Sequence, residues 1–239
     1  QASETLVQWA TGSGSFVRAA DPALSASLPL DQLRMMRVSK GYEGDRVFRG
    51  KYWWWRTGEH VWHESLTERD ELVWLDFDGM TAQVWAQPMV LVWPRSAESH
   101  AHVPDFLTMS VTGQLGLLDV RAAELVDDKF EVDVELTRRA CEAIGWEYDV
   151  ATGHDSTAVA NLAWLKGARH PRYRPAAELL KRLRELALGG CPRRDLAAAL
   201  NPRFPQLVLP HIDWACWHHY LSWDVTTRLE AGTVLHSDD

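Results

Sequence analysis

The chain has 239 residues, which allows one large domain or two small ones, and 46% of its residues are hydrophobic and 24% charged. These proportions exclude a disordered chain and a collagen-like protein, and no apolar run approaches the roughly 18–20 residues that a membrane-spanning helix requires, so no membrane partner is expected. The net charge of −8 argues, taken alone, against a polyanionic partner such as nucleic acid.

The N-terminal part of the chain changes character near residue 50. Residues 1–30 are rich in Ala, Ser and Gly and show little periodicity, which predicts a loose arm. Two aromatic runs, 51–56 and 59–63, flank a short turn that contains Gly58, and this pattern predicts a β-hairpin. A helix is expected to begin at Ser65, because apolar residues then recur every three or four positions.

The middle of the chain is rich in predicted strands. A helix precedes these strands and further helices follow them, which predicts an α/β domain over residues 31–168 with a mixed sheet flanked by helices. The expected elements, in chain order, are extended segments at 84–87, 89–93, 102–111 and 116–120, a helix at 127–145, a strand at 146–150 and a helix at 157–166. Gly145 is a suitable stop for the first of these two helices.

Residues 169–239 are predicted to form a separate C-terminal domain. Pro175 begins a helix that Gly189 and Gly190 end. Further helices are expected at 192–200 and 205–220, and a small hairpin at 221–224 and 233–236. Three short helices and a hairpin match a winged helix-turn-helix, although a helical domain of another kind would fit the same pattern.

The distribution of charge differs from the net value. Residues 166–194 carry nine Lys and Arg against two Glu, residues 34–56 carry seven against two acids, and the acidic residues concentrate between 59 and 135. This distribution favours a protein that contacts a phosphate backbone at its edges and binds cations in its middle. Ordinary solvated helix faces would give the same counts.

Cysteine usage and the N-terminal sequence bear on the compartment. Cys141, Cys191 and Cys216 are widely spaced and form no CxxC motif, so they predict neither a disulfide framework nor a zinc site. The first 30 residues lack a basic stretch followed by an apolar core, which would mark a signal peptide. These features predict a cytoplasmic protein.

Two acidic motifs lie fourteen residues apart on neighbouring predicted strands. Asp105 follows Pro104, and Asp119 precedes Arg121 by two residues, so the last two are expected to point to one face of a strand. Two carboxylates and a backbone carbonyl offer the hard oxygen ligands that Mg²⁺ or Mn²⁺ prefers. Arg121 would hold the attacking water and offset charge at a transferring phosphate. Alternatively, Asp105 lies in a turn and Asp119 pairs with Arg121 or another neighbour.

A third acid is expected from the helix after the hairpin. Glu64 and Glu68 are four residues apart and share a face, and Glu71 lies on a nearby turn. One of them pointing inward, for which Glu68 is the candidate, would complete a metal site. The other two are expected to be surface charges.

The order of these elements resembles the TnsA-like endonuclease subunit of heteromeric cut-and-paste transposases. The resemblance extends from about residue 45 to the C-terminus, and its motifs are KYWWW, HESLTERDELVWLDFD, AQPM, HVPDFL and LLDVRAAE, followed by the basic tail. It implies a restriction-endonuclease-like core with a C-terminal winged-helix-like domain. It also implies a metal-dependent DNA endonuclease that cuts at transposon ends.

The resemblance assigns roles to individual residues. It places the catalytic, metal-binding acids at Glu68, Asp105 and Asp119, with Mg²⁺ as the cofactor and Mn²⁺ as its substitute, and it places Arg121 where the family has Lys. The expected partners are double-stranded DNA, a DDE-type transposase subunit and an ATPase regulator, in the bacterial cytoplasm and on the nucleoid when DNA is bound. The residues expected to bind DNA or the partner are Arg169, Arg172, Arg174, Arg193 and Arg194.

Arg121 departs from the family pattern. Arginine is bulkier than lysine and stays protonated, so it stabilises charge but does not act as a general base. Arg121 therefore favours a second hypothesis, a catalytically weak scaffold or DNA-binding subunit with a nuclease fold. A third hypothesis is a stand-alone nuclease in repair or defence that reads DNA through its own winged helix.

Overall fold

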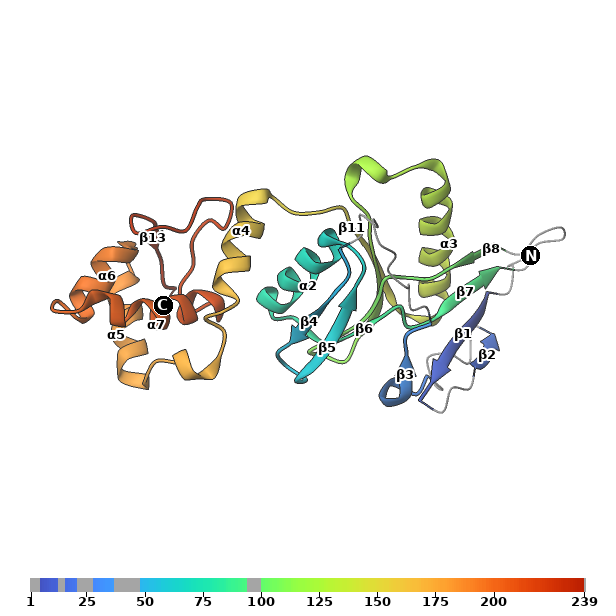
Figure 1. Cartoon of the computed structure of the whole chain (residues 1–239), viewed down its shortest axis with the longest axis horizontal. Coiled ribbons are helices and arrows are strands. Elements are labelled where there is room, and N and C mark those ends of the chain that lie inside the picture. Colours follow the sequence, from blue (N-terminus) through green and yellow to red (C-terminus); the bar gives the residue numbers. More distant parts are fainter. Residues whose placement is uncertain (1–4, 13–15, 21–27, 37–47, 94–99, 239) are drawn as a thin grey trace. The chain divides into compact units, whose positions relative to one another are not determined.

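A computed structural model describes the chain except for residues 1–4, 13–15, 21–27, 37–47, 94–99 and 239 (Figure 1). The chain divides into two compact units. Unit 1 comprises Gln1–Leu72 and Met80–Gly153, and unit 2 comprises Val73–Gly79 and His154–Asp239. The expected α/β class is confirmed, since both strands and helices build the structure.

The central sheet of unit 1 has four strands in the order β11-β10-β9-β6. Strands β6, β9 and β10 form an antiparallel series, and β11 is parallel to β10. Helix α3 connects β10 to β11, because parallel neighbours need a crossover. In chain order the elements are α2 (Leu66–Asp78), β6 (Thr81–Ala86), β9 (Phe106–Ser110), β10 (Leu115–Val120), α3 (Asp128–Ile144) and β11 (Glu147–Ala151).

Helix α3 begins and ends where its capping residues predict. The Asp127 carboxylate accepts a hydrogen bond from the Phe130 backbone N–H at 2.8 Å, which satisfies one N-terminal donor. Gly145 adopts a left-handed conformation with φ of 73°, and its N–H donates to carbonyls of the last turn. The expected helix at 127–145 is therefore confirmed to within one residue at each end.

A second sheet in unit 1 includes strands from the segment that was predicted to be a loose N-terminal arm. Its strands are all antiparallel, in the order β2-β1-β7-β8 with β3 beside β1. They are β1 (Leu6–Thr11), β2 (Phe16–Ala20), β3 (Leu33–Arg34), β7 (Val90–Trp93) and β8 (His100–His102). Residues 1–30 are therefore not a loose arm where the structure describes them.

Strand β1 belongs to the hydrophobic core. Val7 and Trp9 lie two residues apart on one face of the strand and are nearly fully buried, as a strand with one buried face requires. They cluster with Leu107 and Leu117 of the central sheet and with Cys141 of α3. The Ala, Ser and Gly residues around this short alternation conceal it in the composition of the segment.

The expected hairpin is confirmed as β4 (Gly50–Trp54) and β5 (Glu59–His63). Trp54 is completely buried, and its indole N–H donates to the Ala82 carbonyl at 3.0 Å, which fixes the hairpin to β6. Trp53 faces the other way and is 41% exposed.

Unit 2 contains mainly helices. Its elements outside α2 are α4 (Ser156–Leu165), α5 (Ala177–Ala187), β12 (Cys191–Pro192), α6 (Arg193–Leu200), α7 (Leu209–Trp217) and β13 (Val234–Leu235), with short 3-10 turns between some of them. The expected hairpin is replaced by a pairing of β12 with β13 and a single bridge between Ser222 and His236. Among the described residues, no helix is long and apolar enough to cross a membrane.

The boundary between the units lies earlier than the expected position at residue 168. Asn161 of α4 donates to the carbonyls of Val225 and Thr227 and accepts from the Leu229 backbone N–H. These bonds tie α4 to the C-terminal loop, so α4 groups with unit 2.

Helix α7 is shorter than the expected helix at 205–220 and is an interior helix of unit 2. Pro210 lies in its first turn, where the missing N–H is tolerated. Every residue from Ile212 to Trp217 is buried. A helix with so little exposed polar surface is not shaped to read a DNA groove.

Candidate active site

Asp105 and Asp119 are held together at the point where β9 begins and β10 ends. Antiparallel pairing places Phe106 opposite Leu118, so the two aspartates meet at this junction. The Asp105 backbone N–H donates to Asp119 Oδ1 at 3.2 Å. The Val120 backbone N–H donates to Asp105 Oδ2 at 2.8 Å. The sequence prediction that these two acids come together agrees with this geometry.

The partners of Asp119 explain an acid in so apolar a strand. Its side chain is 1% exposed, and a buried carboxylate is tolerated only when it is hydrogen-bonded. The Tyr148 hydroxyl donates to Oδ2 at 2.6 Å, and His102 Nε2 lies 2.8 Å from the same oxygen. Asp119 of β10 is therefore stabilised by hydrogen bonds from side chains of β8 and β11.

Tyr148 was missed by the sequence analysis, and His102 was not included among the site residues. The signal for Tyr148 lies in the register of the parallel strands β10 and β11, which places Tyr148 beside Leu117. Leu117 precedes Asp119 by two residues, so the two share a face of β10. Parallel register is a long-range property, so the local pattern gave no sign of it.

The electrostatics of the site reflect an excess of negative charge. Burial, and then the charges of Glu68 and Asp119, raise the pKa of Asp105 to about 8. Burial by itself lowers the pKa of His102, but the hydrogen bond and charge of Asp119 outweigh it, so this pKa is raised. Burial and the Asp119 charge raise the pKa of Tyr148, so its phenol keeps the proton that it donates.

Glu68 is close enough to act on Asp105 and also caps α2. Its backbone N–H donates to Ser65 Oγ at 3.0 Å, and its Oε2 accepts from the Glu64 backbone N–H at 2.8 Å. This arrangement is a variant of the capping box. Glu68 is buried, as expected for the inward acid, but Glu71 is buried as well and is not the surface charge that was expected.

Arg121 lies just beyond β10, and its contacts are with the segment that leads into α3. Its Nε donates to the Leu125 carbonyl at 2.9 Å, and its guanidinium lies over the Phe130 ring at 5.3 Å. Neither contact is with Asp105 or Asp119. The expected face shared by Asp119 and Arg121 does not bring the guanidinium to the carboxylates, because the strand ends at Val120 and the chain turns.

The donor set suits magnesium, although the side chains do not enclose a metal. Within the described ranges, no three His, Cys, Asp or Glu side chains are arranged to hold a metal ion. Mg²⁺, however, commonly uses one or two carboxylates together with water and substrate phosphate. Burial, and then the charges of Glu68 and Asp119, raise the pKa of Asp105, and a cation would offset the charges of these carboxylates.

Asp119 retains room for one further partner. In the described part of the chain it accepts two hydrogen bonds on Oδ2 and one on Oδ1. A carboxylate has about four acceptor positions, so Oδ1 keeps one unfilled acceptor position. Asp105 is less buried and accepts one bond from Val120, so it offers more capacity.

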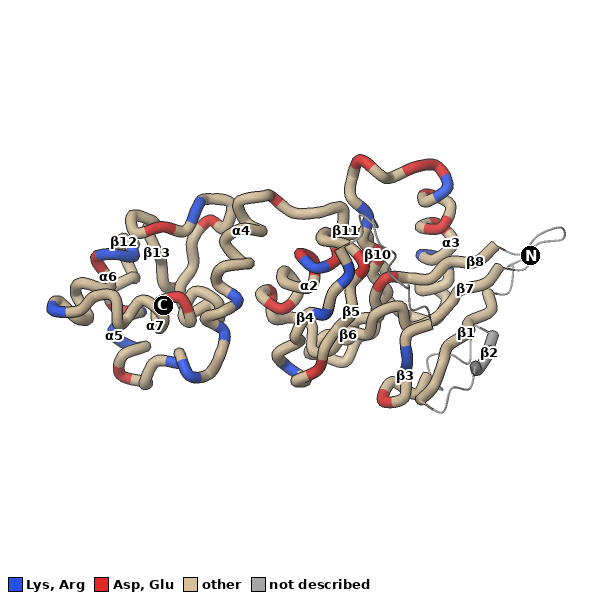
Figure 2. The backbone as a smooth tube through the Cα atoms, viewed as in Figure 1, with Lys and Arg blue, Asp and Glu red and all other residues tan. Residues whose placement is uncertain are grey.

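The five arginines proposed to contact DNA fall into two groups. Arg169 pairs with Asp76 at 2.9 Å, and Arg193 binds Asp213 through two nitrogens, so both guanidiniums lie inside unit 2. The exposed members are Arg172, Arg174 and Arg194. The Lys and Arg positions of unit 2 are spread over α5, α6, the segment before α5 and the segments that follow α6 and α7, and α7 carries none (Figure 2).

No protein-family model matches the sequence, and a comparison with curated proteins gives no match.

Proposed function

We propose that this protein is a metal-dependent DNA endonuclease with a restriction-endonuclease-like core, acting as a TnsA-like subunit beside a DDE-type transposase. The observation that carries the proposal is the Asp105–Asp119 pair at the junction of β9 and β10, under the influence of Glu68 from the preceding helix. The order α2, β6, β9, β10, α3 and β11, interrupted after β6 by β7 and β8 of the second sheet, and the mixed central sheet support it further.

In this proposal Asp105 and Asp119 would hold Mg²⁺ or Mn²⁺, with Glu68 as the third acid beside them. The bound cation supplies Lewis-acid activation of water and neutralises charge at the phosphate. Asp105 supplies the more accessible carboxylate. Tyr148 and His102 hold Asp119 in one orientation by donating to Oδ2. This support fixes the position of Oδ1 for the cation.

Unit 2 is proposed to bind DNA backbone or the transposase partner. The order α5–β12–α6–α7–β13 supports a winged-helix-like domain, with Arg172, Arg174 and Arg194 as the available cations. Since α7 is buried, the proposed contacts are with phosphate rather than with base edges. Sequence specificity would then come from the partner.

The decisive experiment is nicking of supercoiled plasmid by the purified chain in Mn²⁺, with and without the transposase. We expect Asp105→Asn to abolish nicking, because it removes the more accessible ligand. Asp128→Asn is the matched control, since Asp128 is an exposed acid in the first turn of α3. Equal activity of wild type and Asp105→Asn would refute the assigned site.

A second candidate function is a catalytically weak subunit that keeps the nuclease fold. The observation that favours it is the position of Arg121, which bonds to the Leu125 carbonyl instead of to the carboxylates. Mn²⁺ binding without nicking, even beside the transposase, would support this candidate. Nicking gained on Arg121→Lys would show that the position of the Arg121 guanidinium prevents catalysis.

A further inference from the structure

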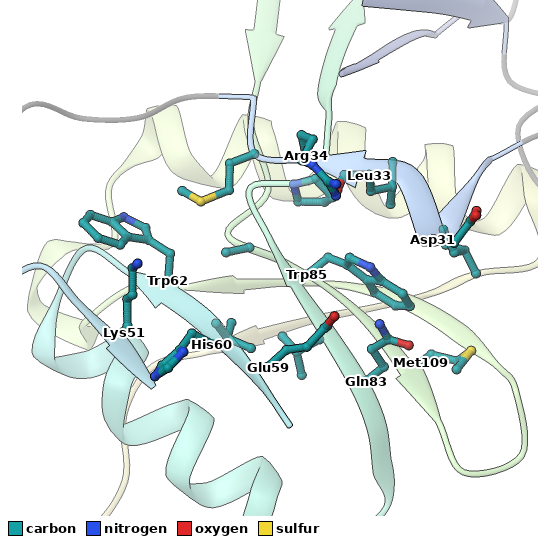
Figure 3. Close-up of a pocket in the computed structure, with 16 residues that line it drawn as sticks. Asp31, Leu33, Arg34, Lys51, Glu59, His60, Trp62, Gln83, Trp85 and Met109 are labelled. Atoms are coloured by element: carbon teal, nitrogen blue, oxygen red, sulfur yellow. The ribbon is translucent and has the colours of Figure 1, made fainter. Parts of the chain in front are cut away.

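Unit 1 contains a cavity of about 700 Å³ that none of the three carboxylates lines. It lies between the β4–β5 hairpin, strand β6 and the segment around β3 (Figure 3). This volume lies within the range of roughly 300–1,000 Å³ that is typical of small-molecule sites. The cavity is therefore large enough for a ligand and separate from the proposed hydrolytic site.

The sheet side of the cavity presents an indole, an amide and a thioether. Gln83 and Trp85 are two residues apart on β6 and so share a face, and pairing sets Met109 of β9 beside Gln83. Figure 3 shows these three side chains together on one side of the cavity. They combine a flat apolar surface with a group that both donates and accepts hydrogen bonds.

The hairpin side is aromatic and basic. Lys51 is paired with Trp62, and Trp53 with His60, so these four side chains share the outer face of the hairpin. Three of them, Lys51, His60 and Trp62, line the cavity opposite Trp85 (Figure 3). Trp53 holds the His60 ring by an edge contact at 5.0 Å and continues the aromatic face out of the cavity.

Trp62 contributes its ring to this wall. Its indole nitrogen is closed to solvent and has no hydrogen-bond partner among the residues that the structure describes. A ligand in the cavity would therefore gain apolar contact with Trp62 and no hydrogen bond from it.

Charges at the cavity are mixed in sign. Lys51 and Arg34 are matched by Glu59 and Asp31. A simple anion would be attracted by the basic side chains and repelled by the acidic ones. A ligand with an anionic group and separate hydrogen-bond donors would interact favourably with both. The aromatic walls add the requirement of a flat ring.

We infer that this cavity binds a nucleotide, with its base between Trp85 and the aromatic hairpin wall and its phosphate at Lys51 or Arg34. Aromatic side chains stack on any base. Glu59 accepts from an exocyclic amine, and a glutamine amide such as that of Gln83 matches the adenine edge, so adenine is preferred to thymine. The source is either a free nucleotide or an unpaired nucleotide of a DNA strand.

This inference goes beyond the proposed endonuclease and does not depend on it. The test is therefore made in EDTA, where the carboxylate site is inactive. A short fluorescein-labelled oligodeoxyadenylate is titrated with the full chain and followed by fluorescence anisotropy, and unlabelled dAMP is added as competitor. We expect binding that dAMP displaces, and weaker binding of oligodeoxythymidylate.

Variants locate the site. Trp85→Ala is expected to weaken binding about tenfold, as loss of one stacking partner does. Because Trp85 also packs against the core, Gln83→Ala and Lys51→Ala provide less disruptive changes at the same cavity. Lys181→Ala is the matched control, since Lys181 is an exposed lysine of α5 in unit 2. Each variant is first checked for an unchanged thermal unfolding midpoint.

The outcomes separate the two sources. Binding of dAMP measured by calorimetry and weakened by Gln83→Ala, without oligonucleotide binding, supports a free-nucleotide site, and oligonucleotide binding that dAMP displaces supports an unpaired base. Oligonucleotide binding that dAMP leaves unchanged and that Lys181→Ala weakens as much as Lys51→Ala would overturn the inference, because it would be backbone binding only. Absence of binding by both probes would overturn it as well.

Discussion

Asp119 in unit 1 and Asp213 in unit 2 are both buried, but they are stabilised in different ways. Asp213 is held by two nitrogens of Arg193 at 2.8–3.0 Å, so the chain itself supplies the opposite charge. Asp119 is held by a tyrosine, a histidine and a backbone N–H, and Asp105 and Glu68 add negative charge nearby.

The difference separates a structural acid from a candidate functional one. In a buried ion pair, a bidentate arginine neutralises the carboxylate and satisfies its hydrogen bonds. Burial also raises the pKa of Asp213, to about 6, although Arg193 opposes this shift. At Asp105, burial and then the charges of Glu68 and Asp119 raise the pKa to about 8, and a bound cation would offset these charges. The five predictions below test this contrast, starting with the largest expected effect.

Breaking the structural pair is expected to have the largest effect on stability. Arg193→Met leaves Asp213 buried without its cation and is expected to lower the free energy of unfolding of unit 2 by about 3–5 kcal/mol. Urea unfolding and hydrogen exchange of the α7 amides measure this change.

Two further variants control for this result. Arg194→Met, at an exposed neighbouring position, is expected to change stability by less than about 0.5 kcal/mol. The double variant Arg193→Met, Asp213→Leu is expected to recover most of the loss, because it removes both charges. An Arg193→Met protein as stable as the Arg194→Met protein would contradict the structural role of the pair.

Removing one donor from Asp119 is expected to have a smaller effect. Tyr148→Phe deletes the 2.6 Å bond to Oδ2 and is expected to lower the free energy of unfolding of unit 1 by about 1.5–3 kcal/mol, the range for hydrogen bonds to charged groups. If Tyr148 also positions a metal ligand, Mn²⁺ affinity measured by calorimetry falls at the same time. Tyr220→Phe, a partly exposed tyrosine of unit 2, is the matched control.

Metal affinity is expected to depend on pH through Asp105. Its pKa is raised to about 8, so below that pH a proton must leave before a cation binds. Mn²⁺ affinity is therefore expected to rise by up to about tenfold per pH unit below this pKa and to level off above it. Asp105→Asn should abolish the dependence, and an unchanged pH profile in that variant would assign the proton to another group.

The stability of the metal-free protein should follow the opposite trend. A raised native pKa means that the folded state holds a proton that the unfolded state releases near pH 4, so this contribution is complete below about pH 4. It is lost as the pH rises through the native value of about 8. Thermal unfolding in EDTA over this range checks the sign, and added Mn²⁺ should restore stability at the upper end.

The smallest effect is expected at Arg121. Its guanidinium bonds to a loop carbonyl and lies over Phe130, and it is partly exposed. Arg121→Ala is expected to change the free energy of unfolding by about 1 kcal/mol or less. A loss comparable to that of Arg193→Met would show that Arg121 neutralises the carboxylates after all.

Local signals predicted much of the fold. The hairpin, α3 and the helix at Ala177–Ala187 follow from alternation, capping residues and Gly stops, all of which act within a few residues. The same local pattern placed Asp105 and Asp119 on neighbouring strands, since a short antiparallel connection brings consecutive strands together.

The partners of the buried charges did not follow from local pattern. Arg169 and Arg193 were expected to contact DNA because they lie in a basic stretch, but each meets an aspartate from another element. Tyr148 and His102 reach Asp119 from 29 and 17 residues away. Charge counts along a sequence record how many charges a segment has, and do not record which ones packing encloses.

The sequence by itself therefore determined the β4–β5 hairpin, α3, α5 and the pairing of two acids, because dihedral preferences, capping and hairpin register depend on nearby residues. Only the tertiary structure decided that β1 joins the core, that α7 is an interior helix, and which carboxylates receive a counter-charge from the chain. These outcomes depend on burial, because a charge removed from water must take a partner from whichever element packs against it.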